Sequence, residues 1–254
     1  MIEVRHLEKV QSILYLNGVT KSFDGFKAIN NLSLDIAPGE LRAIIGPNGA
    51  GKSTMMDIIT GKTRPDVGEV RFKDAVDLTA HDEADIANMG IGRKFQKPTV
   101  VESLTVWENL DLALVGNRGI WQTLFYKPTA EQKARIEEII SLIGLQEKKQ
   151  SEAANLSHGQ KQWLEIGMLI IQDPEVLLVD EPAGGMTDTE TMETAKLLKD
   201  ISKNHSVIVV EHDMDFVRAL DCKVTVLHEG SVLAEGSLDT VSANPRVIEV
   251  YLGR

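Results

Sequence analysis

The chain has 254 residues, of which 43% are hydrophobic, so it can fill the core of one large domain and is neither disordered nor collagen-like. Its formal net charge of −11 and pI of about 5.1 exclude a protein that coats nucleic acid with a basic surface. Its apolar runs are far shorter than the roughly 20 residues that cross a bilayer. The charged N-terminus lacks the apolar core of a signal peptide. The single Cys222 cannot form an internal disulfide, which is compatible with a reducing compartment.

In chain order, short β-like runs separated by turn residues come first and predict a partly antiparallel sheet within about residues 13–85. Residues 86–171 read as an inserted helical subdomain, in which Thr129 and Gln132 form a capping box ahead of a helix. From residue 172 to 254, apolar strands alternate with helices, which predicts a parallel sheet covered on both faces. Residues 13–85 and 172–254 are therefore expected to form one core.

A glycine-rich stretch lies between a predicted strand and a predicted helix. Residues 46–53, GPNGAGKS, fit the P-loop pattern G-x-x-x-x-G-K-[S/T] at every fixed position. Such a loop points its backbone N–H groups at phosphate oxygens, and the following helix adds its positive N-terminal end. Lys52 is expected to reach the β- and γ-phosphates, and Ser53 to bind Mg²⁺. The predicted nucleotide-binding residues here are Gly46, Pro47, Asn48, Gly49, Ala50, Gly51, Lys52, Ser53 and Thr54.

Two acidic residues follow directly after the apolar run at 176–179. Asp180 is expected to orient a metal-bound water, and Glu181 to polarise the water that attacks the γ-phosphate. An acidic pair at a strand end is, by itself, often only a solvated surface. Its occurrence in the same chain as a P-loop favours the catalytic interpretation.

A second candidate anion site begins the helix predicted after Ser157. Ser157 and Gln160 form a capping box, which places backbone N–H groups in the first helical turn. A capping box alone indicates only a well-started helix. Gly159 exposes the backbone in this turn, and the motif lies shortly upstream of Asp180 and Glu181.

The order of these motifs resembles that of the ATP-binding subunits of ABC transporters from residue 13 to the C-terminus. The resemblance rests on the P-loop, Gln96, LSHGQ at 156–160, LLVDEP at 177–182 and His212. It implies an α/β P-loop NTPase cassette with an N-terminal antiparallel β subdomain and an inserted helical subdomain. It also implies an enzyme that binds ATP and Mg²⁺ and hydrolyses ATP between two head-to-tail subunits.

The resemblance also implies roles for single residues. Gln96 is expected to bind Mg²⁺ or the attacking water, so that Ser53, Gln96 and Asp180 hold the metal. His212 is expected to contact the γ-phosphate and to act with Glu181 and Gln96 in catalysis. Phe23 is similar to the aromatic residue that stacks on adenine. Core packing is the alternative for Phe23 and for its neighbours Tyr15 and Phe26.

In this family the LSGGQ-like helix binds the γ-phosphate of the ATP held by the partner subunit. That likeness implies contacts to the partner's ATP from Ser157, His158, Gly159 and Gln160. Two positions depart from the family pattern: His158 replaces the first glycine of the signature, and Thr187 stands at the usual aspartate of the D-loop. Both departures bear on the coupling between subunits.

Several segments are similar to the branched-chain amino acid and amide uptake group. The segments 23–34, 91–110 and 223–236 are most similar to the D-type ATP-binding subunit of bacterial urea importers. The solute implied by this resemblance is urea, and a branched-chain amino acid or another amide is the alternative. No residue of the chain is expected to touch the solute itself.

Importers of this group combine two different ATPase subunits, two integral membrane permeases and a periplasmic solute-binding protein. The resemblance therefore implies a heterodimer on the cytoplasmic face of the inner membrane, with a homodimer in vitro, and no nucleic acid. The helical region 97–155, with its aromatic loop 119–128, is the expected permease docking site. Trp121, Leu124 and Phe125 fit the subdomain's own core equally well.

Two alternatives come from other functional classes. A soluble ABC ATPase acting on ribosomes or DNA would share every nucleotide motif. Such proteins typically have paired cassettes or long inserted arms, and this acidic single cassette is expected to have neither. A module that binds ATP without hydrolysing it is disfavoured by Glu181, Gln96 and His212.

Overall fold

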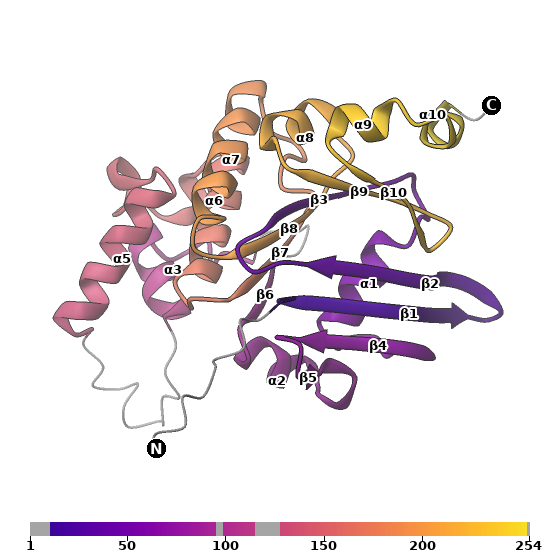
Figure 1. Ribbon diagram of the computed structural model, residues 1–254. Coiled ribbons are helices and arrows are strands. Elements are labelled where there is room, and N and C mark those ends of the chain that lie inside the picture. The colour runs from indigo at the N-terminus through magenta and orange to yellow at the C-terminus, as the bar shows by residue number, and fades with distance from the viewer. Residues whose placement is uncertain (1–10, 95–98, 115–127, 253–254) are drawn as a thin grey trace, which may run out of the picture.

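The computed structural model describes residues 11–94, 99–114 and 128–252, which form two β-sheets with helices around them (Figure 1). The strands are β1 (Leu14–Phe23), β2 (Phe26–Ile36), β3 (Leu41–Ile45), β4 (Val67–Phe72), β5 (Val76–Asp77), β6 (Ile91–Lys94), β7 (Val176–Asp180), β8 (Ser206–Val210), β9 (Lys223–His228) and β10 (Ser231–Gly236). The α-helices are α1 (Lys52–Ile59), α2 (Glu83–Asn88), α3 (Val106–Ala113), α5 (Ala130–Leu142), α6 (His158–Ile170), α7 (Asp188–Ile201), α8 (Met214–Leu220), α9 (Leu238–Ser242) and α10 (Pro245–Leu252).

The smaller sheet is antiparallel, as the short N-terminal runs predict. Its strand order is β2-β1-β4-β5, and Leu14 of β1 lies opposite both Ile36 of β2 and Phe72 of β4. These three side chains are buried, because alternate residues of each strand face the same side. The sheet therefore presents an apolar face to α1 and to the larger sheet (Figure 1).

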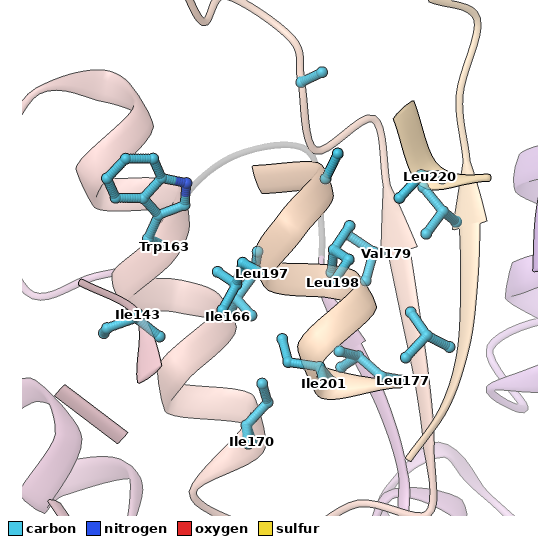
Figure 2. Packing of buried hydrophobic residues seen from close by; sticks show 14 of the residues in the cluster. Ile143, Trp163, Ile166, Ile170, Leu177, Val179, Leu197, Leu198, Ile201 and Leu220 are labelled. Atoms are coloured by element: carbon cyan, nitrogen blue, oxygen red, sulfur yellow. The ribbon is translucent and has the colours of Figure 1, made fainter. Parts of the chain in front are cut away.

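The larger sheet has the order β10-β9-β3-β8-β7-β6, and within it only β10 is paired antiparallel. Strand β7 is buried along its whole length, as expected for a strand covered on both faces. Val176 and Leu178 face the core with α1 and the smaller sheet, whereas Leu177 and Val179 face the helices. Figure 2 shows the cluster on the helix side of the sheet, with Leu177 beside Ile201 of α7 and with α6 beyond α7. The predicted α/β fold class is confirmed.

The interpretation of residues 86–171 as helical missed β6. This four-residue strand pairs in parallel with β7, with Lys94 opposite Val179. Its sequence, IGRK, contains a single large apolar residue, so tertiary pairing rather than local propensity decides its conformation. Helices α3, α5 and α6 then pack on one another, as expected for a helical segment. Among the described residues, no helix has the length and apolarity that crossing a bilayer requires.

A buried ion pair ties β6 to α6. Lys94 Nζ lies 3.4 Å from Glu165 Oε2, and both side chains are almost fully inaccessible to solvent. Burial lowers the pKa of the Lys94 ammonium, and Glu165 opposes that shift. The other Glu165 oxygen accepts hydrogen bonds from Thr99 N and Oγ1. The carboxylate thus binds residues on both sides of the segment that contains Gln96, which lies outside the described residues.

Removing one partner of this pair should destabilise the protein strongly. We expect Lys94→Met to lower the free energy of unfolding by about 3–5 kcal/mol, because the Glu165 charge then stays buried without a counterion. The double variant Lys94→Met/Glu165→Leu should recover most of that loss, since Thr99 is exposed and can bind water instead. Urea unfolding of the parent, the single variant and the double variant measures both effects. A single variant as stable as the parent would show that the pair is not buried.

Candidate nucleotide site

The predicted phosphate and acidic motifs meet at one edge of the larger sheet. Parallel strands end at the same edge, and β3, β8 and β7 are neighbours in that order. The ladder continues past the strand ends: Glu181 N donates to Val210 O at 2.9 Å, and Glu211 N donates to Ile44 O at 3.1 Å. The loops after these three strands are therefore fixed relative to one another by backbone hydrogen bonds.

The P-loop needs glycine at two of its positions for steric reasons. A Cβ on Gly46 would lie 2.3 Å from Leu227 O, and one on Gly51 would lie 2.6 Å from Ala28 O. Both residues also have positive φ values, 157° and 100°. Gly51 is the N-cap of α1 and has no side chain to bond the first N–H groups. Those groups remain available to a phosphate.

Lys52 lies within this loop. Its Nζ donates to Gly46 O at 2.6 Å and to Pro47 O at 3.1 Å, so the ammonium is bonded to the first two carbonyl groups of the P-loop. Burial lowers the pKa of Lys52, while the carboxylates of Glu181 and Asp180 act in the opposite direction. The two acidic residues are therefore close enough to act on the P-loop lysine.

Asp180 is the last residue of β7 and is buried. Burial raises the pKa of its carboxyl, and Arg93 of β6, with NH2 3.5 Å from Oδ2, opposes the rise. Arg93 also bonds Asp57 of α1 at 2.5 Å. The described residues contain no cluster of three or more His, Cys, Asp or Glu side chains that would bind a metal alone. One carboxylate and the Ser53 hydroxyl suit Mg²⁺, which keeps several waters and binds substrate phosphates.

Glu181 and His212 lie side by side at the same edge. His212 Nδ1 is 3.6 Å from Glu181 Oε1, and the imidazole is 66% exposed. Glu181 adopts the left-handed conformation, with φ of 46°, which is uncommon for a residue that is not glycine. The structure thus brings Glu181, His212, Asp180 and Lys52 together.

Glu211 is a further site residue, which the sequence analysis missed. Its carboxylate is buried and accepts hydrogen bonds from Ala183 N at 3.0 Å, His212 N at 2.9 Å and Asp213 N at 3.3 Å. It therefore joins the loop after β7 to the loop after β8. The sequence did contain a sign of this role. Glu211 directly follows the apolar run at 207–210, in the same way that Asp180 follows the run at 176–179.

The aromatic residues near the N-terminus differ in burial. Phe23 is 46% exposed and Phe26 is 66% exposed, whereas Tyr15 is half-buried. Core packing therefore does not account for Phe23 or Phe26. Lys21 Nζ lies 5.5 Å from the centroid of the Phe23 ring. The stacking of Phe23 on adenine, which the resemblance implies, stays a prediction.

The second predicted anion motif forms as a capped helix start. Ser157 Oγ accepts from Gln160 N at 3.2 Å, and Gln160 Oε1 accepts from Ser157 N at 3.1 Å. His158 Nε2 lies 3.1 Å from Gly184 O. Thr187 is the N-cap of α7, with Glu190 completing its capping box. The two departures from the family pattern thus face the same loop.

Comparison with known proteins agrees with this geometry. A family model described as ABC transporter matches residues 29–184, more than half of the chain. A second model, described as branched-chain amino acid ATP-binding cassette transporter, matches residues 231–254. The high-affinity branched-chain amino acid transport ATP-binding protein LivG of Escherichia coli (strain K12) is 34% identical over 252 residues, which cover 96% of this chain and 98% of LivG.

Solved structures show the same similarity. An ATP-binding cassette of an ABC transporter in its ADP conformation has a TM-score of 0.81 at 30% identity, covering 96% of this chain and all of that chain. A dimeric cassette in a post-hydrolysis state, bound to ADP and Pi, has a TM-score of 0.73 at 28% identity. That comparison covers 89% of this chain and 98% of the dimeric cassette's chain.

The hydrogen bonds of Glu211 lead to a prediction for this site. Glu211→Gln should leave at least one of these three N–H groups, of which that of Ala183 is buried, without an acceptor, lowering the free energy of unfolding by about 1–3 kcal/mol. Because the loops of Glu181 and His212 then shift, ATP hydrolysis should fall by about tenfold or more while nucleotide binding persists. Denaturant unfolding and phosphate release measure the two effects. Glu249→Gln, at an exposed carboxylate of α10, is the control, and equal behaviour of both variants would contradict the assignment.

Proposed function

This chain belongs to the ABC transporter family as an ATP-hydrolysing cassette, and on that premise we propose that it drives the import of branched-chain amino acids. The match of residues 231–254 to the branched-chain amino acid cassette model carries this proposal. The similarity to LivG along nearly the whole chain supports it. Urea is the second candidate, because the segments 23–34, 91–110 and 223–236 resemble those of urea importers.

In the proposed mechanism, ATP binds first to the P-loop of this chain. Phe23 stacks on the adenine, and the backbone N–H groups of residues 46–54, except Pro47, which has none, surround the phosphates. Lys52 leaves its two carbonyl partners, Gly46 O and Pro47 O, and bonds the β- and γ-phosphates instead. Its charge suits this exchange, since a phosphate compensates a partly buried ammonium better than a carbonyl does.

Hydrolysis is then assigned to the residues at the ends of β7 and β8. Ser53 and Asp180, with Gln96 as a proposed third ligand, would hold Mg²⁺, which when bound neutralises phosphate charge. Glu181 orients the attacking water and accepts its proton. His212 contacts the γ-phosphate, and Glu211 fixes the backbone of both loops through its three N–H bonds.

The second half of the site belongs to a partner ATPase subunit. Ser157, His158, Gly159 and Gln160 are proposed to contact the γ-phosphate of the partner's ATP, so that ATP binding closes the two subunits and hydrolysis releases them. Integral membrane permeases receive this motion, and a periplasmic solute-binding protein delivers the solute to them. The expected docking loop, residues 119–128 with Trp121, Leu124 and Phe125, lies outside the described residues except for position 128.

Glu181→Gln tests the catalytic assignment. This variant should bind ATP as the parent does but hydrolyse it about 10²–10⁴-fold more slowly, since a general base is lost without a change in size. Equilibrium binding of ATP and phosphate release by the assembled complex separate the two effects. Lys52→Ala is the matched comparison and should lose binding instead. Unimpaired steady-state hydrolysis by Glu181→Gln would remove Glu181 from the mechanism.

Purification of the assembled complex tests the transport proposal. The chain, tagged and extracted from its source cells in mild detergent, should recover two polytopic permeases and a second ATPase. In proteoliposomes, leucine presented with its binding protein should raise ATP turnover several-fold, and urea should not. Stimulation by urea alone would assign the second candidate. Recovery of ribosomes or DNA-repair proteins would reject transport and leave the ATPase chemistry intact.

A further inference from the structure

The start of α6 and the start of α7 share one carboxylate, that of Glu190. We call their contact region the signature junction; it comprises Ser157, His158, Gly159, Gly184, Thr187 and Glu190. Glu190 Oε2 accepts from Thr187 N and Thr187 Oγ1, both at 3.0 Å. Glu190 Oε1 accepts from Ser157 Oγ at 2.9 Å. The carboxylate that completes the capping box of α7 thus also binds Ser157, the N-cap of α6.

Close packing holds this carboxylate in place. A Cβ on Gly159 would lie 2.7 Å from both Glu190 Cδ and Glu190 Oε1, so the carboxylate lies directly against the backbone of the first turn of α6. Further along the same two helices, Trp163 Nε1 donates to Thr194 Oγ1 at 2.8 Å, and its indole nitrogen points toward α7 in Figure 2. The two helices are therefore held against each other at two places, Gly159 with Glu190 and Trp163 with Thr194.

His158 adds a second contact across the junction. Its Nε2 faces Gly184 O, which can only accept, so Nε2 carries a proton. Gln162 Nε2 lies 3.3 Å from the same protonated atom, while the buried Gln162 Oε1 has no hydrogen-bond partner. The Nε2 proton is donated to Gly184 O, so it is not also available to Gln162. The signature helix is thus also bonded to the loop that follows Glu181.

The hydroxyl of Ser157 has one proton, and that proton is already committed. Ser157 Oγ accepts from Gln160 N and donates to Glu190 Oε1. It cannot at the same time donate to a phosphate oxygen. The negative charge of Glu190 also lies at the N-terminal end of α6, where it opposes a second anion. Hydrogen bonds from the Thr187 backbone, and next from Ser157, lower the pKa of Glu190, so this charge is present at neutral pH.

We propose that Glu190 is a positioning residue that directs the Ser157 proton away from the partner subunit's ATP and so raises the ATP concentration needed for turnover. This inference rests on the proposed function, because it requires Ser157 to face a nucleotide held by the partner. When the two subunits close on ATP, the Ser157 hydroxyl donates its proton to the phosphate instead of to Glu190. Glu190 keeps its two bonds to Thr187. The cap of α7 therefore survives the exchange.

The variant Glu190→Gln isolates this effect. Its amide oxygen still accepts from Thr187, whereas its NH₂ group faces Ser157 Oγ as a donor, so the Ser157 proton is released and the charge is removed. In the purified permease complex, the ATP concentration that gives half-maximal hydrolysis should fall by about three- to tenfold, with little change in the maximal rate. In a Ser157→Ala background only the effect of the removed charge remains, so the same substitution should lower the half-saturating concentration by clearly less than it does in the parent background.

The control is Glu108→Gln, because Glu108 completes the capping box of α3 with Thr105 in the same way but bonds no signature residue. It should leave the half-saturating ATP concentration unchanged. The inference is overturned if Glu190→Gln does not lower that concentration, or if the decrease persists undiminished in Ser157→Ala. ATP hydrolysis by the parent complex tests the proposed function separately. If the parent complex does not hydrolyse ATP, it is the proposed function that fails.

Discussion

The parallel pairing of β3, β8 and β7 is the constraint on which the rest of the site depends. It places Ile44, Val210 and Asp180 at matching positions of three neighbouring strands. The backbone ladder then extends into the following loops through Glu181 N and Glu211 N. Residues separated by more than a hundred positions in the chain therefore share one edge of the sheet, where the proposed mechanism needs phosphate-binding groups, a metal-binding carboxylate and a base together.

Buried carboxylates hold the segments around this edge in place. Glu211 accepts three backbone N–H groups from two loops, and Glu165 binds both Lys94 and Thr99. Asp180 is different, because burial raises its pKa, and the positive charges of Arg93, 3.5 Å away, and of Lys94 oppose that rise without cancelling it. The structural carboxylates are largely satisfied by the protein, whereas Asp180 retains capacity for an additional cation.

The two departures from the family pattern belong to the same contact region. His158 bonds the carbonyl of Gly184, and Thr187 caps α7 with the carboxylate that also bonds Ser157. A glycine at position 158 could not form the first contact. An aspartate at position 187 would place a second carboxylate beside Glu190. His158 therefore links the signature helix to the loop that follows Glu181, and Thr187 shares its carboxylate partner with Ser157.

The sequence by itself determined the P-loop, the acidic pair after 176–179 and the capped helix starts, because each depends on residues within a few positions of one another. It also predicted the α/β class from the spacing of apolar residues. Only the tertiary structure decided that IGRK forms β6, that Glu211 joins two loops and that Glu190 bonds Ser157. Those features depend on pairing and packing between segments distant in the chain, which local propensity does not encode.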